Sequence, residues 1–106
     1  MCYKSIEVYY DIADIPGCDG SNPMDPKAQP FRDAASELIE TALENAGLGS
    51  CEGAEIGMGE INLAFEVSDC GAAEAAVRAA VSGTPYEGIR EIVRFEEELE
   101  DERDVA

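Results

Sequence analysis

The stretch EINLAFEVSDCGAAEAAVRAAVSGTP, residues 60–85, decides the fold, because it holds a strand, a helix and the signals that separate them. In residues 60–68 apolar side chains alternate with polar ones, which is the pattern of a strand with one buried face. Asp69 then offers an N-cap for an alanine-rich helix over residues 71–82, and Gly83 offers its stop. The stretch therefore predicts a strand followed by a helix that packs on it.

The same two patterns occur on its N-terminal side. Residues 4–12 alternate as residues 60–68 do and predict a first strand. Residues 31–46 repeat apolar side chains at helical spacing between Pro30 and Gly47, residue types that favour the start and the end of a helix. The apolar side of this helix is predicted to carry Phe31, Ala35, Leu38, Ile39, Ala42 and Ala46.

Two further strands complete the pattern. Residues 49–59 predict a short, irregular strand among glycines, and residues 88–97 predict a last strand that buries Ile89, Val93 and Phe95. The order β, α, β, β, α, β predicts an α+β domain of ferredoxin-like topology, with a four-stranded antiparallel sheet and two helices on one face. We assign residues 1–97 to this single domain and residues 98–106 to an acidic C-terminal tail.

Charge restricts the partners more than any motif does. Twenty-four Asp and Glu face seven Lys and Arg, so the net charge is -17. Nucleic acid and anionic membranes are therefore unfavourable partners, whereas a basic protein is favoured. The chain has no apolar run of about 18 residues and no secretory signal pattern, which predicts a cytoplasmic protein. Its four cysteines, with no C-x-x-C pair, are predicted to be thiols.

Several kinds of chemistry are excluded by residue content. The chain has no histidine, so Ser-His-Asp and Cys-His catalysis are ruled out. No Cys spacing fits structural zinc, and no glycine-rich phosphate loop is present. Catalysis by carboxylates alone stays open, but acids are so abundant that no particular pair is indicated. We predict a non-enzymatic protein without a cofactor.

Acidic side chains gather in two places that form the candidate partner-binding surface. The first is a stripe on one side of the 31–46 helix, formed by Asp33, Glu37, Glu40 and Glu44. The second is the C-terminal segment with Glu96, Glu97, Glu98 and Glu100. A row of carboxylates resembles the charge along a nucleic-acid strand. We therefore predict an inhibitor or immunity-type protein that blocks a nuclease or a nucleic-acid-guided effector. The simpler alternative is that the stripe is only the solvated face of a helix in a very acidic protein.

The sheet face turned away from the helices offers another kind of surface. We expect it to present Glu7, Tyr9, Asn62, Glu66, Arg90 and Arg94. Two arginines opposite two glutamates would make a self-complementary patch, so a homodimer through the sheet is an alternative prediction.

Two other functions stay open on sequence alone. The first is a small dimeric ligand-binding protein or enzyme that uses the cavity between the sheet and the long loop over residues 13–29, in which case Tyr9, Tyr10 and Cys18 would matter most. Oxygen-bearing side chains of this loop could also hold calcium, although turn formation explains them more simply: Asp14, Asp19, Asn22 and Asp25. A housekeeping domain adapted to high salt would account for the acidity without any partner.

Overall fold

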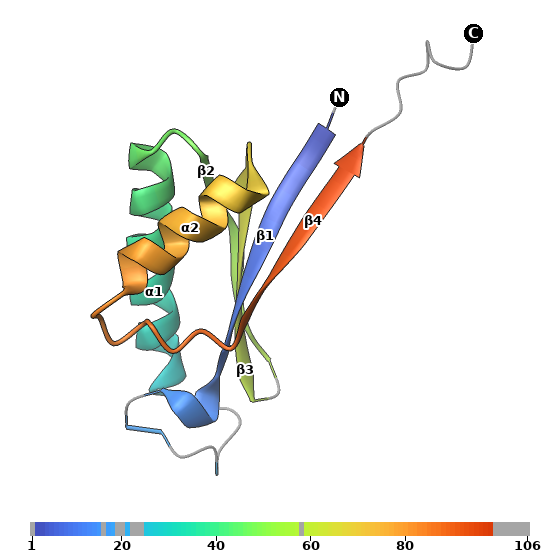
Figure 1. Ribbon diagram of the computed structural model, residues 1–106. Helices are drawn as coiled ribbons and strands as arrows, with labels where there is room; N and C mark the ends of the chain where they lie inside the picture. The colour runs from blue at the N-terminus through green and yellow to red at the C-terminus, as the bar shows by residue number, and fades with distance from the viewer. Residues whose placement is uncertain (1, 16, 19–20, 22–24, 58, 99–106) are drawn as a thin grey trace, which may run out of the picture.

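The computed structural model describes residues 2–15, 17–18, 21, 25–57 and 59–98 (Figure 1). Its elements along the chain are β1 (Cys2–Asp11), the 3-10 helix η1 (Ile12–Asp14), α1 (Ala28–Asn45), β2 (Gly49–Gly57), β3 (Glu60–Val67), α2 (Cys70–Val81) and β4 (Glu91–Glu98). The strands form one sheet in the order β2-β3-β1-β4, and each neighbouring pair is antiparallel. The predicted α+β class with a four-stranded antiparallel sheet is confirmed.

The core lies between the sheet and the two helices, which cover the same face (Figure 1). The central strands β1 and β3 contribute every second side chain to it, as the alternation predicts. The fully buried side chains from these strands include Ile6, Val8, Tyr10, Ile61, Leu63 and Phe65. From the helices come Ala35, Ile39, Leu43, Ala73 and Val77. In the described part of the chain, no helix is both long and apolar enough to cross a membrane.

A capping residue marks the start of α2, and a glycine marks the end of α1. The side chain of Asp69 accepts a hydrogen bond from the Ala72 N–H at 2.9 Å, and this caps α2. At the end of α1, Gly47 adopts a φ of 69°. This left-handed residue lets the Leu48 N–H reach the Leu43 carbonyl at 2.8 Å, which closes the last turn. Helix α1 begins at Ala28, one turn earlier than predicted, because Asp25 organises the preceding turn through the Lys27 N–H.

The predicted facing of the last strand is wrong. Residues paired across two strands share a face, and Val8 pairs with Ile92 while Ser5 pairs with Phe95. Ile92 therefore faces the helices, whereas Val93 and Phe95 face away from them. The pattern was misleading because Ile89 precedes the strand: the chain from 82 to 90 is irregular, and β4 starts only at Glu91.

Strand β2 is irregular, as its glycines predict. Its pairing with β3 shifts register between Cys51 and Gly53, so an extra residue bulges from this edge strand. The bulge leaves the Cys51 N–H pointing at helix α1, where a carboxylate accepts it.

Candidate functional site: the open face of the sheet

The sheet has one face without helices, which we call the open face. Its central strands place Tyr3, Ser5, Glu7 and Tyr9 of β1 beside Asn62, Ala64 and Glu66 of β3. The edge strands add Glu52 and Glu55 of β2, and Val93 and Phe95 of β4. Aromatic rings and carboxylates thus share a surface that the described chain leaves uncovered.

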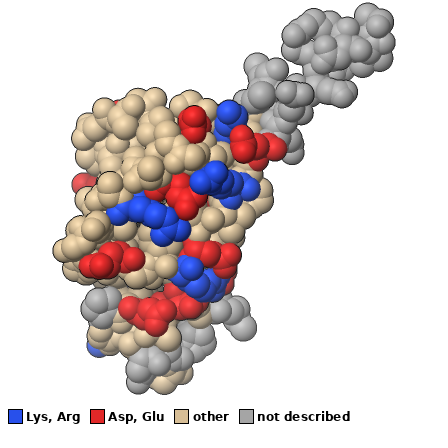
Figure 2. All heavy atoms as spheres, in the orientation of Figure 1, with Lys and Arg blue, Asp and Glu red and all other residues tan. Residues whose placement is uncertain are grey.

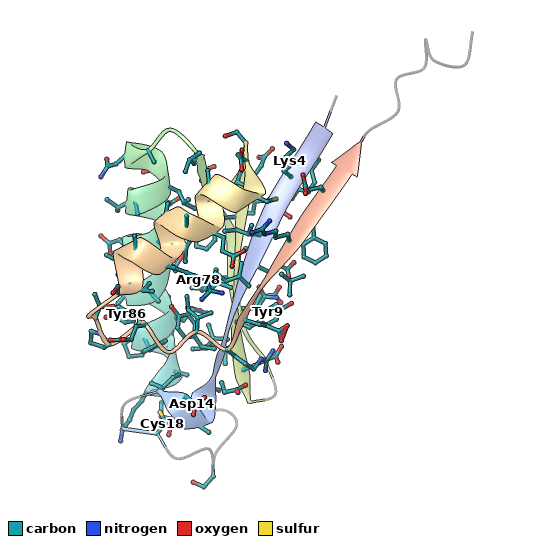
Figure 3. All side chains as sticks on the ribbon, in the orientation of Figure 1. Lys4, Tyr9, Asp14, Cys18, Arg78 and Tyr86 are labelled. Carbon is teal, nitrogen blue, oxygen red and sulfur yellow. The ribbon has the colours of Figure 1, made fainter. Side chains whose placement is uncertain are left out.

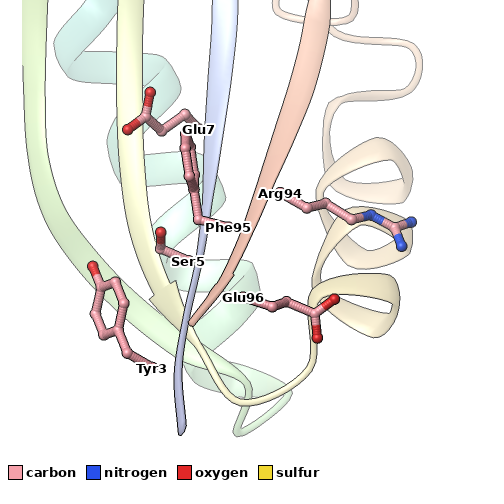
Figure 4. Close-up of a pocket in the computed structure, with 6 residues that line it drawn as sticks. All are labelled: Tyr3, Ser5, Glu7, Arg94, Phe95 and Glu96. Carbon is pink, nitrogen blue, oxygen red and sulfur yellow. The ribbon is translucent and has the colours of Figure 1, made fainter. Parts of the chain in front are cut away.

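A hollow of about 520 Å³ lies on this face between β1 and β4. Ser5 pairs with Phe95 across the two strands and lies between Tyr3 and Glu7 along β1. Because serine is much smaller than these neighbours, their side chains rise around it (Figure 4). Among the described residues, Phe95 is the one large apolar side chain that is exposed, at 43%. Ser5 is only 5% exposed.

The hollow is negatively charged on its open-face side. Arg94 and Glu96 also line it, but their side chains point from β4 towards α2 (Figure 4). There Arg94 pairs with Glu74 at 2.8 Å. Its guanidinium therefore does not neutralise the carboxylate of Glu7.

Glu7 is held in place by two neighbours. The Tyr9 hydroxyl donates to its Oε1 at 2.5 Å, and the Asn62 side-chain amide donates to the same oxygen at 3.0 Å. A second tyrosine behaves in the same way, because the Tyr3 hydroxyl donates to the Glu52 carboxylate. Two tyrosines of β1 therefore each hold one carboxylate in place on the open face.

These carboxylates change how the tyrosines ionise. The hydrogen bond to Glu7, together with desolvation and the charges of nearby glutamates, raises the pKa of Tyr9 to about 12. The hydrogen bond to Glu52 raises the pKa of Tyr3, although Ser5 partly opposes it. In both tyrosines the largest cause of the raised pKa is the hydrogen bond that the hydroxyl donates to a carboxylate.

We predict an alkaline titration that reports this network. The folded pKa of Tyr9, about 12, lies above its ordinary value of 10.0, so the folded protein retains a proton that the unfolded chain releases. The stabilising contribution of Tyr9 is therefore complete below pH 10 and is lost as the pH rises from 10 towards 12. The difference in tyrosinate absorbance between the wild type and Tyr9→Phe, measured while circular dichroism shows a folded protein, should rise well above pH 10. A midpoint near pH 10 would contradict the network.

The described arginines are paired with carboxylates rather than left available to a partner. Arg90 lies over the Tyr9 ring at 5.2 Å and contacts Asp11 at 2.7 Å and Glu60 at 3.1 Å. It therefore meets the open face at the start of β4, as predicted. The prediction for Arg94 is wrong, because the shifted facing of β4 places it on the helix side. Figure 2 shows that Lys and Arg side chains in this view lie next to Asp and Glu, not in a patch of their own.

The acidic stripe of α1 is only partly a solvent-facing row. Asp33, Glu37 and Glu44 are exposed, but Asp33 pairs with Arg32 at 2.9 Å. Glu40 turns towards the sheet and accepts a hydrogen bond from the Cys51 N–H of β2 at 3.0 Å. The stripe thus borders edge strand β2, and the open-face residues Glu52 and Glu55 lie on the other side of the same strand.

The role of Glu40 gives a stability prediction. Glu40→Ala removes the acceptor of the Cys51 N–H in the bulge, and we expect the free energy of unfolding to fall by about 1 kcal/mol. Glu44→Ala, at an exposed position on the same helix, should change it by less than about 0.5 kcal/mol. Urea denaturation of the two variants checks this, and equal midpoints would show that the Glu40 hydrogen bond is unimportant.

The other predicted site residues are separated or lie outside the described part. Glu96 is 3.9 Å from Lys4, Glu97 and Glu98 are described only as backbone of β4, and Glu100 lies outside the described residues. In the 13–29 loop, Asp19 and Asn22 also lie outside them. The three residues of the ligand-binding alternative do not share a surface: Tyr9 is on the open face and Cys18 packs against the core. Tyr10 is buried and donates to the Tyr86 carbonyl at 2.7 Å, in the segment that joins α2 to β4 (Figure 3).

Sequence reasoning did not identify Tyr3, Ser5 or Phe95 as residues of the site. The alternation of residues 4–12 already places Ser5 on the same face as Glu7, and its extension by two residues to Cys2 places Tyr3 there as well. Among the described cysteines Cys18, Cys51 and Cys70, no disulfide forms. The chain matches no protein-family model, no curated protein and no solved structure.

Proposed function

We propose that this protein is a non-enzymatic inhibitor or immunity-type protein that occupies the basic nucleic-acid-binding surface of a partner, such as a nuclease or a nucleic-acid-guided effector. The observation that carries the proposal is the open face, where carboxylates surround the exposed ring of Phe95 and the half-buried rings of Tyr3 and Tyr9. Its acidic residues are Glu7, Glu52, Glu55 and Glu66, with Glu60 and Glu91 around Arg90.

The geometry of the sheet sets the distances between these charges. Neighbouring strands lie about 5 Å apart, and alternate residues of one strand lie about 7 Å apart. The register pairs Glu7 with Ala64, Glu66 with Ser5 and Glu55 with Asn62, so these carboxylates are spread over the open face rather than aligned in one row. We propose that this spread of negative charge takes the place of the phosphates of a nucleic acid on the partner. The net charge of -17 adds long-range attraction, so we expect association to be fast and to weaken as salt is added.

We propose that the contact surface continues around edge strand β2 to the acidic stripe of α1. Asp33, Glu37 and Glu44 then form its second side. The C-terminal segment adds further charge through Glu96, Glu97 and Glu98 of β4 and through Glu100, which lies outside the described residues. We also propose the ferredoxin-like assignment, because a helix follows β1 and another follows β3 in a sheet of order β2-β3-β1-β4.

Capture of the partner tests the proposed function. A tagged full-length chain is bound to resin, exposed to host lysate at low salt, and eluted with a rising salt gradient. The proposal predicts one basic nucleic-acid-binding protein that elutes with salt and whose nucleic-acid-dependent activity falls when the acidic protein is added. A folded chain that captures no such protein would contradict it.

Folding at low salt distinguishes the proposed function from adaptation to high salt. Circular dichroism at low and at molar salt shows whether the chain needs salt to fold. An inhibitor of a cytoplasmic target should be folded at low salt, whereas adaptation to high salt predicts unfolding there.

A homodimer through the sheet stays a prediction that sedimentation velocity can measure. The patch expected to hold it is not formed, because Arg94 lies on the helix side and Arg90 is paired with three carboxylates. Two open faces brought together would instead oppose glutamates to glutamates, so a basic partner fits this face better than a second copy does.

A further inference from the structure

We infer that the hollow between β1 and β4 receives an arginine side chain of a basic polypeptide. This inference rests on the proposed function and names the chemical group that the open face recognises. Its basis is the combination of a recess, an exposed aromatic ring and an ordered carboxylate within one small area: Tyr3, Ser5, Glu7 and Phe95.

The shape of the hollow follows from one small residue. Ser5 sits between two larger side chains on its own strand and opposite Phe95 on the next strand. A larger residue at this position would raise the base of the hollow, so the depth of the recess between Tyr3, Glu7 and Phe95 depends on serine here. The carbonyl of Ser5 accepts a bond from the buried Cys70 thiol at 3.6 Å on the helix side, which ties the base of the hollow to α2.

The chemistry of the hollow favours a cation with an apolar stem. The ring of Phe95 and the ring of Tyr3 offer π-faces, and cations are attracted to such faces by about 0.5–2 kcal/mol. Glu7 is held by Tyr9 and Asn62 through Oε1 and is therefore already oriented for an incoming donor. Glu66, which pairs with Ser5 across β1 and β3, adds a second negative charge beside the recess.

Arginine fits these features better than lysine does. A guanidinium is planar, is weakly hydrated and stacks on aromatic rings while it donates to a carboxylate, whereas an ammonium remains strongly hydrated. The protein repeats this arrangement internally, because Arg90 lies over the Tyr9 ring and pairs with Asp11 and Glu60. The acidic C-terminal segment of the same chain is an unsuitable occupant, since its carboxylates would face Glu7 and Glu66.

The test uses the full-length chain and two defined probes, an arginine–glycine repeat peptide and a lysine–glycine repeat peptide of equal length and charge. NMR titration at low salt measures both affinities and the residues that respond. We expect the arginine peptide to bind about 10-fold tighter, equivalent to about 1.4 kcal/mol, with the largest shifts at Tyr3, Ser5, Glu7 and Phe95. Phe95→Leu removes the ring and Ser5→Val makes the base of the recess shallower, and each should reduce the preference to about twofold or less.

The matched control is the double variant Glu37→Gln with Glu44→Gln. It makes the protein less negative without changing a residue of the hollow. It should weaken both peptides to a similar extent and leave the arginine preference intact. Equal binding of the two peptides by the wild type, or an unchanged preference in folded Phe95→Leu and Ser5→Val, would overturn the inference. If the chain nevertheless captures a basic nucleic-acid-binding protein from lysate, the proposed function stands although the arginine inference fails. The two experiments therefore distinguish failure of the inference from failure of the proposed function.

Discussion

Replacement of four open-face glutamates by glutamine is expected to weaken binding of the basic partner by about 100-fold at low salt. The residues changed are Glu7, Glu52, Glu55 and Glu66. An exposed charge pair contributes about 0.2–1 kcal/mol, so four of them together account for about 3 kcal/mol. Glutamine retains the side-chain oxygen that accepts from Tyr9 and Tyr3, which preserves the local structure. Surface plasmon resonance over a range of salt concentrations measures the affinity and its salt dependence.

The matched control removes the same number of charges from helix α1, with Asp33→Asn, Glu37→Gln, Glu40→Gln and Glu44→Gln. Both variants have the same net charge, so a difference between them locates the contact surface. The open-face variant should lose more affinity than the helix variant. The opposite result would assign the contact to the helix stripe that the sequence predicted, and unchanged affinity in both would contradict charge mimicry.

Gly49→Ala should strongly destabilise the fold although it adds only one methyl group. A Cβ at this position would lie 2.0 Å from the Glu66 carbonyl oxygen and 3.0 Å from the Val67 Cα, both of which are backbone atoms of β3. The clash cannot be relieved by a side-chain rotation, so the start of β2 has to separate from its partner strand. We expect the free energy of unfolding to fall by about 3 kcal/mol, measured by urea denaturation.

Gly57→Ala is the matched control at the other end of the same strand. A Cβ at Gly57 meets no atom within 4 Å, so this variant should change the unfolding free energy by less than about 0.5 kcal/mol. Equal stability of the two variants would mean that β2 and β3 do not approach each other as described. Peptide binding to the hollow should be unaffected by Gly57→Ala, because β1 and β4 form that site.

The predictable part of the fold rests on strong local signals. Residues 60–68 and 4–12 alternate with period two, and the strands they predict agree with β3 and β1 to within two residues. Asp69 and Gly83 mark the ends of α2, since capping is local chemistry that needs no tertiary information. These segments also form most of the core, so the α+β class could be read from them.

The site was harder to predict because it depends on pairing between distant strands. Whether Phe95 is buried or exposed is decided by its pairing with Ser5, which is 90 positions away in the sequence and can be read only from the register. Glu40 looked like one more member of an exposed stripe, but the bulge at Cys51 gives it a backbone partner. Helical spacing identifies which side chains share a face, but it does not reveal which of them find partners on another element.

The most direct test of the central claim is competition for the captured partner between nucleic acid and this protein. A labelled duplex or single strand is bound to the partner, and fluorescence anisotropy is followed as the wild-type chain or the open-face variant is added. We predict that the wild type displaces the nucleic acid, that displacement weakens as salt is raised, and that the open-face variant needs about 100-fold more protein. A stable complex that holds nucleic acid and the acidic protein together would contradict the account, because the two are proposed to occupy the same basic surface.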